Sequence, residues 1–243
     1  MAQQMIHPAR PHQWDITIQE ARELQRELAG LVSLTPSPEL QAISIVAGID
    51  NGYVKQETGW FAFAAAVVFS FPALELVETA IGEAPVTFPY VPGFLTFREG
   101  PAILAALAGL TTEPEVLLFD GQGYAHPRRI GLATHMGVVL DHPTIGCAKT
   151  RLVGKYDEPP DEPGSVSRLI DRGEVVGAAV RTKPGHDPLF VSPGHKVDID
   201  LAVRITLACC RPGEFLPVPT KAAHDAVTAH TAPLRRRKLR STQ

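Results

Sequence analysis

The sequence predicts an α/β fold, and three observations support this class. Short apolar runs typical of buried strands recur along the chain, and two of them end in an aspartate followed by glycine. The first three predicted strands follow one another as a meander. Beyond them helices and strands alternate, which favours a mixed sheet flanked by helices. With 243 residues and 44% hydrophobic residues, the chain is long enough for one such domain with a substantial core.

The N-terminal half is expected to contain one helix and the meander. Residues 15–32 have helical periodicity, with charged residues between the apolar ones. Asn51 and Gly52 are expected to turn the chain after the first strand, and Phe71-Pro72-Ala73 after the second. The three strands are predicted over 44–50, 59–71 and 74–81.

In the second half, a helix is expected over 96–110, in which Pro101 should perturb the helix because a proline lacks the backbone N–H. Strands are then predicted over 116–119 and 144–148, helices over 130–140, 197–210 and 220–230, and a late hairpin over 174–181 and 189–192. This order is that of a ribonuclease-H-like sheet, although the pattern alone establishes only the α/β class.

Composition and charge limit the context of the protein. No stretch approaches the ~20 apolar residues of a membrane span, and residues 1–14 lack the apolar core of a signal peptide. The three cysteines, Cys147, Cys209 and Cys210, have neither disulfide nor zinc spacing, so we expect a cytoplasmic protein without a membrane partner. Cys209 and Cys210 lie within a helical pattern and are expected to pack in the core.

The net charge of −3 includes five basic residues within 234–240, so the rest of the chain carries −8, because −3 − 5 = −8. An acidic body argues against nucleic-acid binding by bulk charge and permits binding by local basic patches. The basic tail is interpreted either as one such patch or as a disordered solubilising segment.

Two aspartates at predicted strand ends are the strongest functional signal. Asp50 and Asp120 each end an apolar run, and the carboxyl ends of strands form the edge of an open sheet where ligands bind. Neighbouring carboxylates there repel by several kcal/mol at an effective dielectric constant of about 20, and a divalent cation makes the arrangement tolerable. Glu99, on the helix over 96–110, is a third acidic candidate.

A proline-stiffened loop precedes Glu99. Two prolines three residues apart hold an extended, rigid loop, which consists of Pro89, Tyr90, Val91 and Pro92. A rigid aromatic side chain beside an acidic cluster is suited to replace the stacking of a displaced base. The alternative interpretation is a hydrophobic loop packed on the core.

Further polar candidates follow the later strands. After Asp120, Gly121 and Gly123 allow the backbone to approach a ligand closely, and His126 is suited to orient a ligand or contact a phosphate. Lys149 follows the strand over 144–148, and a lysine beside a metal cluster stabilises charge on a phosphoryl transition state. Lys149 and the helical His224 are, taken alone, also typical of surface residues without function.

In combination and in order, these stretches resemble the endonuclease V family of deoxyinosine-directed endonucleases. The likeness runs from about Val46 to His230. It rests on Gly48-Ile49-Asp50 with Gly52-Tyr53, Pro89-Tyr90-Val91-Pro92-Gly93 through Phe97-Arg98-Glu99, Asp120-Gly121-Gln122-Gly123 through His126-Pro127-Arg128, Pro143-Thr144-Ile145-Gly146 through Lys149, and Leu216-Pro217 through His224. Each motif alone is weak, whereas their joint occurrence is specific.

The resemblance implies one ribonuclease-H-like domain over 15–232, between a flexible segment 1–14 and a basic tail 233–243. It implies a monomeric enzyme that uses Mg²⁺, with Mn²⁺ as a substitute, to cleave the second phosphodiester bond 3′ to deoxyinosine in DNA and so initiate repair. The implied metal ligands are Asp50, Glu99 and Asp120, and the catalytic group is completed by Lys149 and His224.

The resemblance also implies how the base is recognised. Tyr90 would act as the wedge, and backbone groups would read the lactam edge of the flipped hypoxanthine, in a pocket lined by Gly93, Leu95, Gly121 and Leu152. His224 stands where some members carry Asp, which lowers the negative charge of the site by one. The base-recognition roles and the position of His224 in the site are predictions about this chain.

Three alternative functions stay open or are disfavoured by the residues. Inosine in RNA is the open alternative substrate, because the contacts to a 2′-hydroxyl cannot be read from sequence. A non-catalytic nucleic-acid-binding module would lack Asp50, Glu99 or Asp120, and all three are present. A phosphotransferase would need a nucleotide-phosphate loop, and the sequence has no P-loop.

Overall fold

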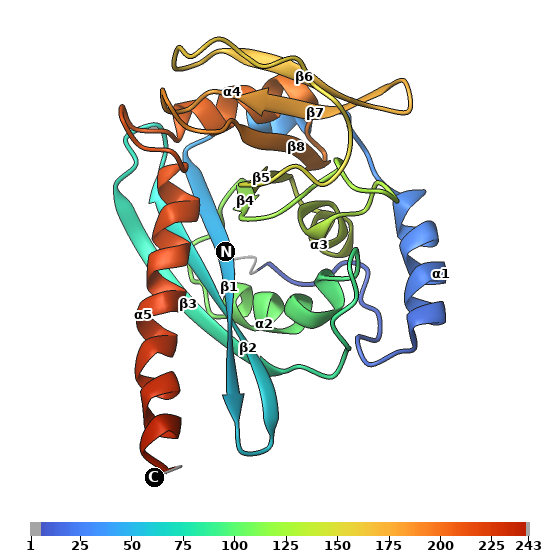
Figure 1. Cartoon of the computed structure of the whole chain (residues 1–243), viewed down its shortest axis with the longest axis vertical. Helices are drawn as coiled ribbons and strands as arrows, with labels where there is room; N and C mark the ends of the chain where they lie inside the picture. Colours follow the sequence, from blue (N-terminus) through green and yellow to red (C-terminus); the bar gives the residue numbers. More distant parts are fainter. Residues whose placement is uncertain (1–5, 242–243) are drawn as a thin grey trace.

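A computed structural model describes residues 6–241, except for the side chains of Glu39 and of residues 236–241. Its centre is an eight-stranded mixed sheet in the order β3-β2-β1-β4-β5-β8-β7-β6 (Figure 1). The strands are β1 (Ile45–Gln56), β2 (Gly59–Ser70), β3 (Leu76–Pro85), β4 (Val116–Phe119), β5 (Thr144–Ala148), β6 (Val166–Asp171), β7 (Glu174–Val180) and β8 (Leu189–His195).

The predicted meander is confirmed, but its first strand is longer than expected. β1 pairs with β2 along its whole length, from Ile45↔Ser70 to Gln56↔Gly59, whereas its parallel pairing with β4 ends at Ile49↔Phe119. The predicted turn at Asn51 and Gly52 is therefore wrong, because the ladder with β2 continues through both residues. Asp50 lies at the point where β4 ends beside β1, so it still meets the edge of the parallel strands.

Helices cover both faces of the sheet. On one face, α4 (Ile199–Ala208) and α5 (Val218–Ser241) contribute to a core that includes Val46, Phe63 and Leu118. On the other face, α2 (Thr96–Ala108) and α3 (Leu132–Leu140) pack against Ile49, Leu117 and Phe119. Figure 1 shows α5 lying along β1, and α1 (Ile18–Ala29) at the outer edge of the molecule. A short 3₁₀ helix, Pro38–Gln41, precedes β1.

Other differences from the predicted elements have local causes. β6 was not predicted because its residues are largely exposed at the sheet edge and lack a buried apolar run. α2 continues through Pro101, whose missing N–H removes the helical partner of the Phe97 carbonyl. The last helix runs to Ser241, past the predicted end at His230. Cys209 is a buried free thiol, as expected, whereas Cys210 is only half-buried; Cys147 is also free and buried.

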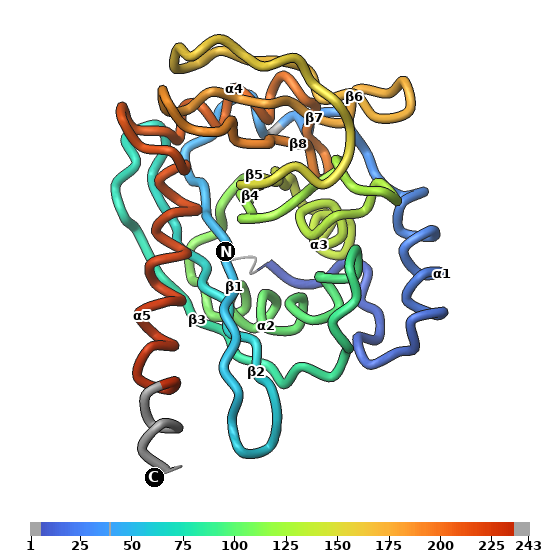
Figure 2. Tube along the Cα trace, in the orientation of Figure 1, coloured from blue at the N-terminus to red at the C-terminus, as the bar shows by residue number. Residues whose placement is uncertain are grey.

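Residues 6–14, expected to be flexible, lie against the body of the protein. The backbone N–H of Arg10 donates to the Val139 carbonyl at 2.9 Å, and its side chain pairs with Asp141 at 2.9 Å. Trp14 stacks on the buried His135 and His12 lies tilted beside it, with ring centroids 5.7 and 5.0 Å from that of His135. Figure 2 shows this segment passing close to α3. The domain boundaries proposed from sequence stay predictions.

Candidate active site

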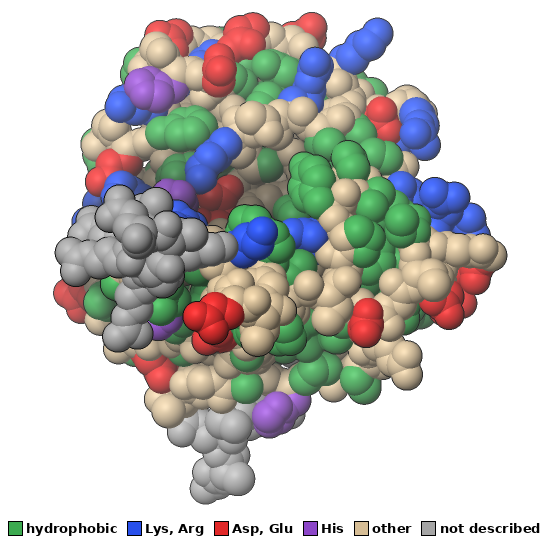
Figure 3. Space-filling model, turned by 60° about the horizontal axis from the view of Figure 1, so that its bottom comes forward, with side chains coloured by type: hydrophobic (Ala, Val, Ile, Leu, Met, Phe, Trp, Pro, Cys, Tyr) green, Lys and Arg blue, Asp and Glu red, His purple; other side chains and the backbone are tan. Residues whose placement is uncertain are grey.

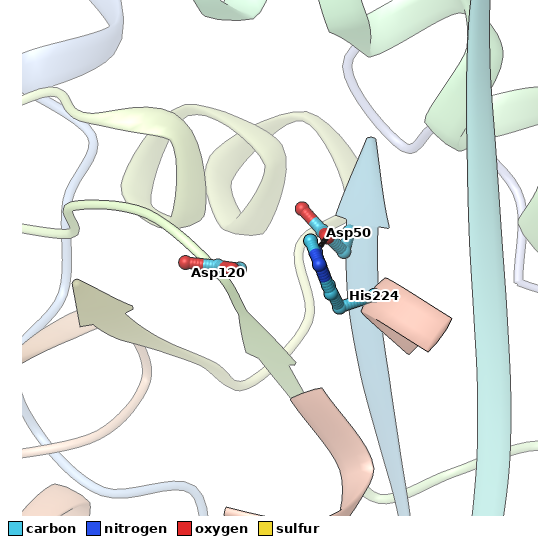
Figure 4. Close-up of side chains that lie close together, drawn as sticks. All are labelled: Asp50, Asp120 and His224. Carbon is cyan, nitrogen blue, oxygen red and sulfur yellow. Dashed lines mark hydrogen bonds and ion pairs between the residues drawn. The ribbon is translucent and has the colours of Figure 1, made fainter. Parts of the chain in front are cut away.

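Asp50, Asp120 and His224 converge at the end of β4, and we call these three residues the acidic centre (Figure 4). One ligand atom from each lies within 4.8 Å of the others. A ring nitrogen of His224, Nδ1, is 2.8 Å from Asp50 Oδ2. Three residues far apart in the chain are thus brought together by β1, by the turn after β4 and by the first turns of α5.

Glycines of β1 bring His224 to this position. A Cβ added to Gly48 would lie 2.0 Å from the carbonyl oxygen of Pro219, so only glycine lets the start of α5 approach the strand this closely. Gly52 in the same strand faces Val227 of the same helix. Because side chains alternate along a strand, Asp50 lies between these glycines on the face that meets α5.

Glu99 reaches the site from α2, on the opposite face of β1. Its carboxylate is 6% exposed and accepts from Tyr53 Oη at 2.9 Å and from Asn51 Nδ2 at 3.3 Å. Among the described residues, the acidic centre is the only group of three His, Cys, Asp or Glu residues whose ligand atoms lie within 4.8 Å of one another. The structure therefore brings together two of the three predicted ligands and places Glu99 beside them.

The carboxyl groups repel one another in a buried setting. Burial and then the Asp120 carboxylate raise the pKa of Asp50. Burial raises the pKa of Glu99 to about 8, and the charges of Asp50 and Asp120 add to that rise, although the Tyr53 hydroxyl opposes it. Ionisation of these groups is costly in the protein alone, and a bound cation would lower that cost.

The residues fit a hard divalent cation. Carboxylate oxygens are the preferred ligands of Mg²⁺, and ligands about 2.1 Å from one octahedral ion lie about 3.0–4.2 Å apart. In the acidic centre, one ligand atom from each residue lies within 4.8 Å of the others. Asp50 and Asp120 would hold such an ion, with His224 and Glu99 as neighbours able to complete its surroundings. The identity of the ion belongs to the proposal below.

Lys149 lies directly after β5, as predicted from sequence. Its Nζ is 2.5 Å from Asp120 Oδ2, and the lysine side chain is 39% exposed while that of the aspartate is 12% exposed. Lys149 thus carries a positive charge to the solvent-facing side of the acidic centre. A phosphate that approached from solvent would meet this charge beside Asp120.

An open cavity of about 540 Å³ lies between the proline loop and the acidic centre. Of the predicted substrate residues, those that line it are Tyr90, Val91, Pro92, Gly93, Leu95, Gly121, His126 and Leu152, together with Asp120 and Lys149. On the face shown in Figure 3, hydrophobic side chains gather beside recessed charged ones. Two predicted substrate residues do not line the cavity. Pro89 is exposed to solvent outside it. Gly123 is buried against the Pro193 carbonyl, and its backbone N–H donates to Ser192 Oγ.

The proline loop is anchored by aromatic residues and leaves Tyr90 free. Phe88 and Phe94 are each 2% exposed and pack with Phe97, whereas Tyr90 is 75% exposed. The alternative of a loop packed on the core therefore fits Phe88 and Phe94 at the ends of the loop, whereas Tyr90 and its neighbour Pro89 are exposed. A large, exposed and rigidly mounted aromatic ring remains available to a ligand.

His126 lines the cavity as a neutral ring. Burial, together with the positive charge of Arg128, lowers the pKa of His126 to about 4. Its Nδ1 accepts from the Arg128 backbone N–H at 3.2 Å. Near neutral pH the ring carries no positive charge, so it can take part in hydrogen bonding but cannot neutralise a phosphate.

Sequence reasoning missed the supporting roles of three polar residues in the site. Asn51 and Tyr53 contact Glu99, and they were overlooked because β1 was expected to end before them. Gln25, fully buried, donates from Nε2 to the Gly93 carbonyl at 3.0 Å and accepts from Arg128 Nε at 2.6 Å. A polar residue on the apolar face of the predicted N-terminal helix was the available signal for Gln25.

Comparisons with known proteins identify the family. The Endonuclease V family model matches residues 26–225. The endonuclease V of Gloeobacter violaceus is 47% identical over 215 residues, which cover 88% of this chain and 86% of that protein. The crystal structure of Bacillus subtilis endonuclease V matches with a TM-score of 0.88 at 33% identity and covers 93% of this chain and 97% of that one.

A second similar structure, from Ciona intestinalis, is an endonuclease V in complex with a 24-mer DNA that contains an inosine followed by a ribo-adenosine. It matches with a TM-score of 0.75 at 28% identity, covering 89% of this chain and 98% of that one.

The fold and the converging acidic residues define a ribonuclease-H-like nuclease, as the sequence predicted. The chain belongs to the endonuclease V family. Among the helices described within residues 6–241, none is long and apolar enough to cross a membrane.

Proposed function

We propose that the protein is a Mg²⁺-dependent endonuclease that recognises deoxyinosine in DNA and cleaves the second phosphodiester bond on its 3′ side. The observation that carries the proposal is the shared cavity, whose wall runs from Tyr90 to Asp120 and Lys149. A base bound in this cavity would hold the adjoining backbone beside the acidic centre. The inosine-containing DNA in the Ciona complex supports the choice of substrate.

Each part of the site has a role that follows from its position. The exposed Tyr90 ring fills the gap that a flipped nucleotide leaves in the duplex. The cavity, at about 540 Å³, is of the size that proteins use for small ligands, and glycine backbone at Gly93 and Gly121 can approach the base edge. One chain contains both base cavity and acidic centre, so we expect a monomer to act.

The chemical step is placed at the acidic centre. A bound Mg²⁺ would activate water and polarise the phosphate, and Mn²⁺ would substitute for it. Asp50 and Asp120 bring carboxylate oxygens within 4.8 Å of each other, and Glu99 adds a third carboxylate from the other face of β1. Lys149, beside Asp120, stabilises the negative charge that develops on the phosphoryl oxygens.

The test uses end-labelled duplexes with a single inosine, as DNA, as DNA with a ribose 3′ to the inosine, and as RNA. With Mg²⁺ we expect a cut at the second phosphodiester bond 3′ to inosine in DNA, and no cut with EDTA. Cleavage restricted to ribose-containing strands would show the RNA alternative to be correct, and cleavage independent of inosine would refute the recognition of this base.

A matched inactive variant completes the test. Asp120→Ala removes a carboxylate that lines the cavity but leaves the wedge loop intact, so cleavage should be abolished while inosine-DNA binding in Ca²⁺ persists. Activity within tenfold of wild type would remove the metal-site assignment.

A further inference from the structure

β1 continues past Asp50, and this extension supplies a second layer to the site. Asn51 and Tyr53 are two residues apart, so they lie on the same face of the strand, opposite to Asp50. That face meets α2, where Tyr53 Oη donates to Glu99 Oε1 at 2.9 Å and Asn51 Nδ2 donates to Glu99 Oε2 at 3.3 Å. Both oxygens of a nearly buried carboxylate are therefore held by residues of β1.

The Tyr53 ring also contacts a cation that reaches the wedge. The guanidinium carbon of Arg98 is 5.2 Å from the centroid of the Tyr53 ring and 5.8 Å from that of Tyr90. The same guanidinium donates through Nη1 to the Phe88 carbonyl at 2.7 Å, at the start of the proline loop. One side chain thus touches the wedge, the base of its loop and the tyrosine that holds Glu99.

We infer that Tyr53 is a positioning residue whose hydroxyl fixes the Glu99 carboxylate beside the acidic centre and which Arg98 links to the wedge Tyr90. The inference rests on the proposed function. A carboxylate with a fixed rotamer is ready to meet a cation without reorganisation, and hydrogen-bond partners of this kind commonly set metal affinity. Through Arg98 and Tyr53, a change in the position of Tyr90 alters the position of the Glu99 carboxylate.

Tyr53→Phe is the minimal perturbation, because it removes one oxygen and keeps the ring against Arg98. Mn²⁺ binding to the metal-free variant, measured by calorimetry without DNA, should weaken by about 10- to 100-fold, the range for losing a partner of a metal-binding group. The Mg²⁺ concentration for half-maximal cleavage of inosine DNA should rise in parallel, whereas KM for the DNA at saturating Mg²⁺ should stay near that of wild type.

Tyr124→Phe is a matched control. Tyr124 Oη donates to Glu174 Oε1 at 2.7 Å and its ring lies 5.6 Å from the guanidinium carbon of Arg129, so the same chemistry is removed away from the acidic centre. This variant should bind Mn²⁺ as wild type does, and circular dichroism should show both variants folded. Mn²⁺ affinity of Tyr53→Phe equal to or tighter than that of wild type would overturn the positioning role.

The link to the wedge is tested by a double-mutant cycle between Tyr53→Leu, which removes the ring that contacts Arg98, and Tyr90→Ala. Single-turnover rates on inosine duplex should be non-additive, because the two side chains share Arg98 as a neighbour. Effects that multiply within about twofold would overturn the link. The calorimetric result needs no substrate, so a wild-type protein that failed to cut inosine DNA would refute the proposed function without deciding the role of Tyr53.

Discussion

Replacement of Tyr90 by alanine separates recognition from folding more cleanly than any other change in the site. The Tyr90 ring is 75% exposed, whereas the loop that carries it is anchored by Phe88 and Phe94, each 2% exposed. Removing the ring deletes no core contact, so unfolding stability should change by no more than about 0.5 kcal/mol, as at other surface sites. Any loss of function then reports the ring itself.

The expected loss follows from base stacking. A base–aromatic contact contributes about 1–3 kcal/mol, and each 1.4 kcal/mol corresponds to about tenfold in affinity. Tyr90→Ala should therefore weaken binding to an inosine duplex by about ten- to a hundredfold and affect undamaged DNA much less. Tyr90→Phe keeps the ring and should retain most of the affinity.

Fluorescence anisotropy with labelled DNA in Ca²⁺ measures binding without cleavage. Single-stranded or mismatched inosine substrates need less unstacking, so they should partly restore binding to Tyr90→Ala. If this variant bound and cut inosine duplexes as well as wild type did, the wedge assignment would be wrong. If Tyr90→Phe were as weak as Tyr90→Ala, the phenolic hydroxyl rather than stacking would be the important group.

Three further changes test other parts of the site. Lys149→Ala should lower the single-turnover rate by about 10²–10³ with little change in affinity, and the opposite result would make Lys149 a phosphate anchor. Gly48→Ala places a Cβ 2.0 Å from the Pro219 carbonyl oxygen, and urea unfolding should show a loss of about 1–3 kcal/mol. Burial raises the pKa of Glu99 to about 8, so the folded, metal-free protein binds the proton of this carboxyl more tightly than the unfolded chain does. The contribution of Glu99 to the free energy of unfolding should therefore be fully present below a pH of about 4 and be lost as the pH rises through about 8. Glu99→Gln should flatten this trend in thermal unfolding between pH 5 and 9, and an unchanged trend would contradict the shift.

Much of the fold could be predicted because its central strands are fully buried. The ranges 116–119 and 144–148 coincide with β4 and β5, since a strand covered on both faces reads as an uninterrupted apolar run. β1 was cut short because Asn-Gly is a strong turn signal, and only the ladder with β2, a tertiary contact, overrides it. β6 lies at an edge and carries no such run, so local sequence could not reveal it.

For the candidate site as well, local sequence predicted the residues, whereas their arrangement depends on long-range contacts. Each charged residue could be nominated from its own motif, but the arrangement depends on contacts that no motif contains. His224 lies beside Asp50, 174 residues earlier, because Gly48 lets the carbonyl of Pro219 approach the strand. The missing part of the prediction was the side-chain alternation of β1: once the strand continues, Asp50 must face α5 while its neighbours face α2. That alternation puts Glu99 and its hydrogen-bond donors on one side of the strand and the histidine on the other.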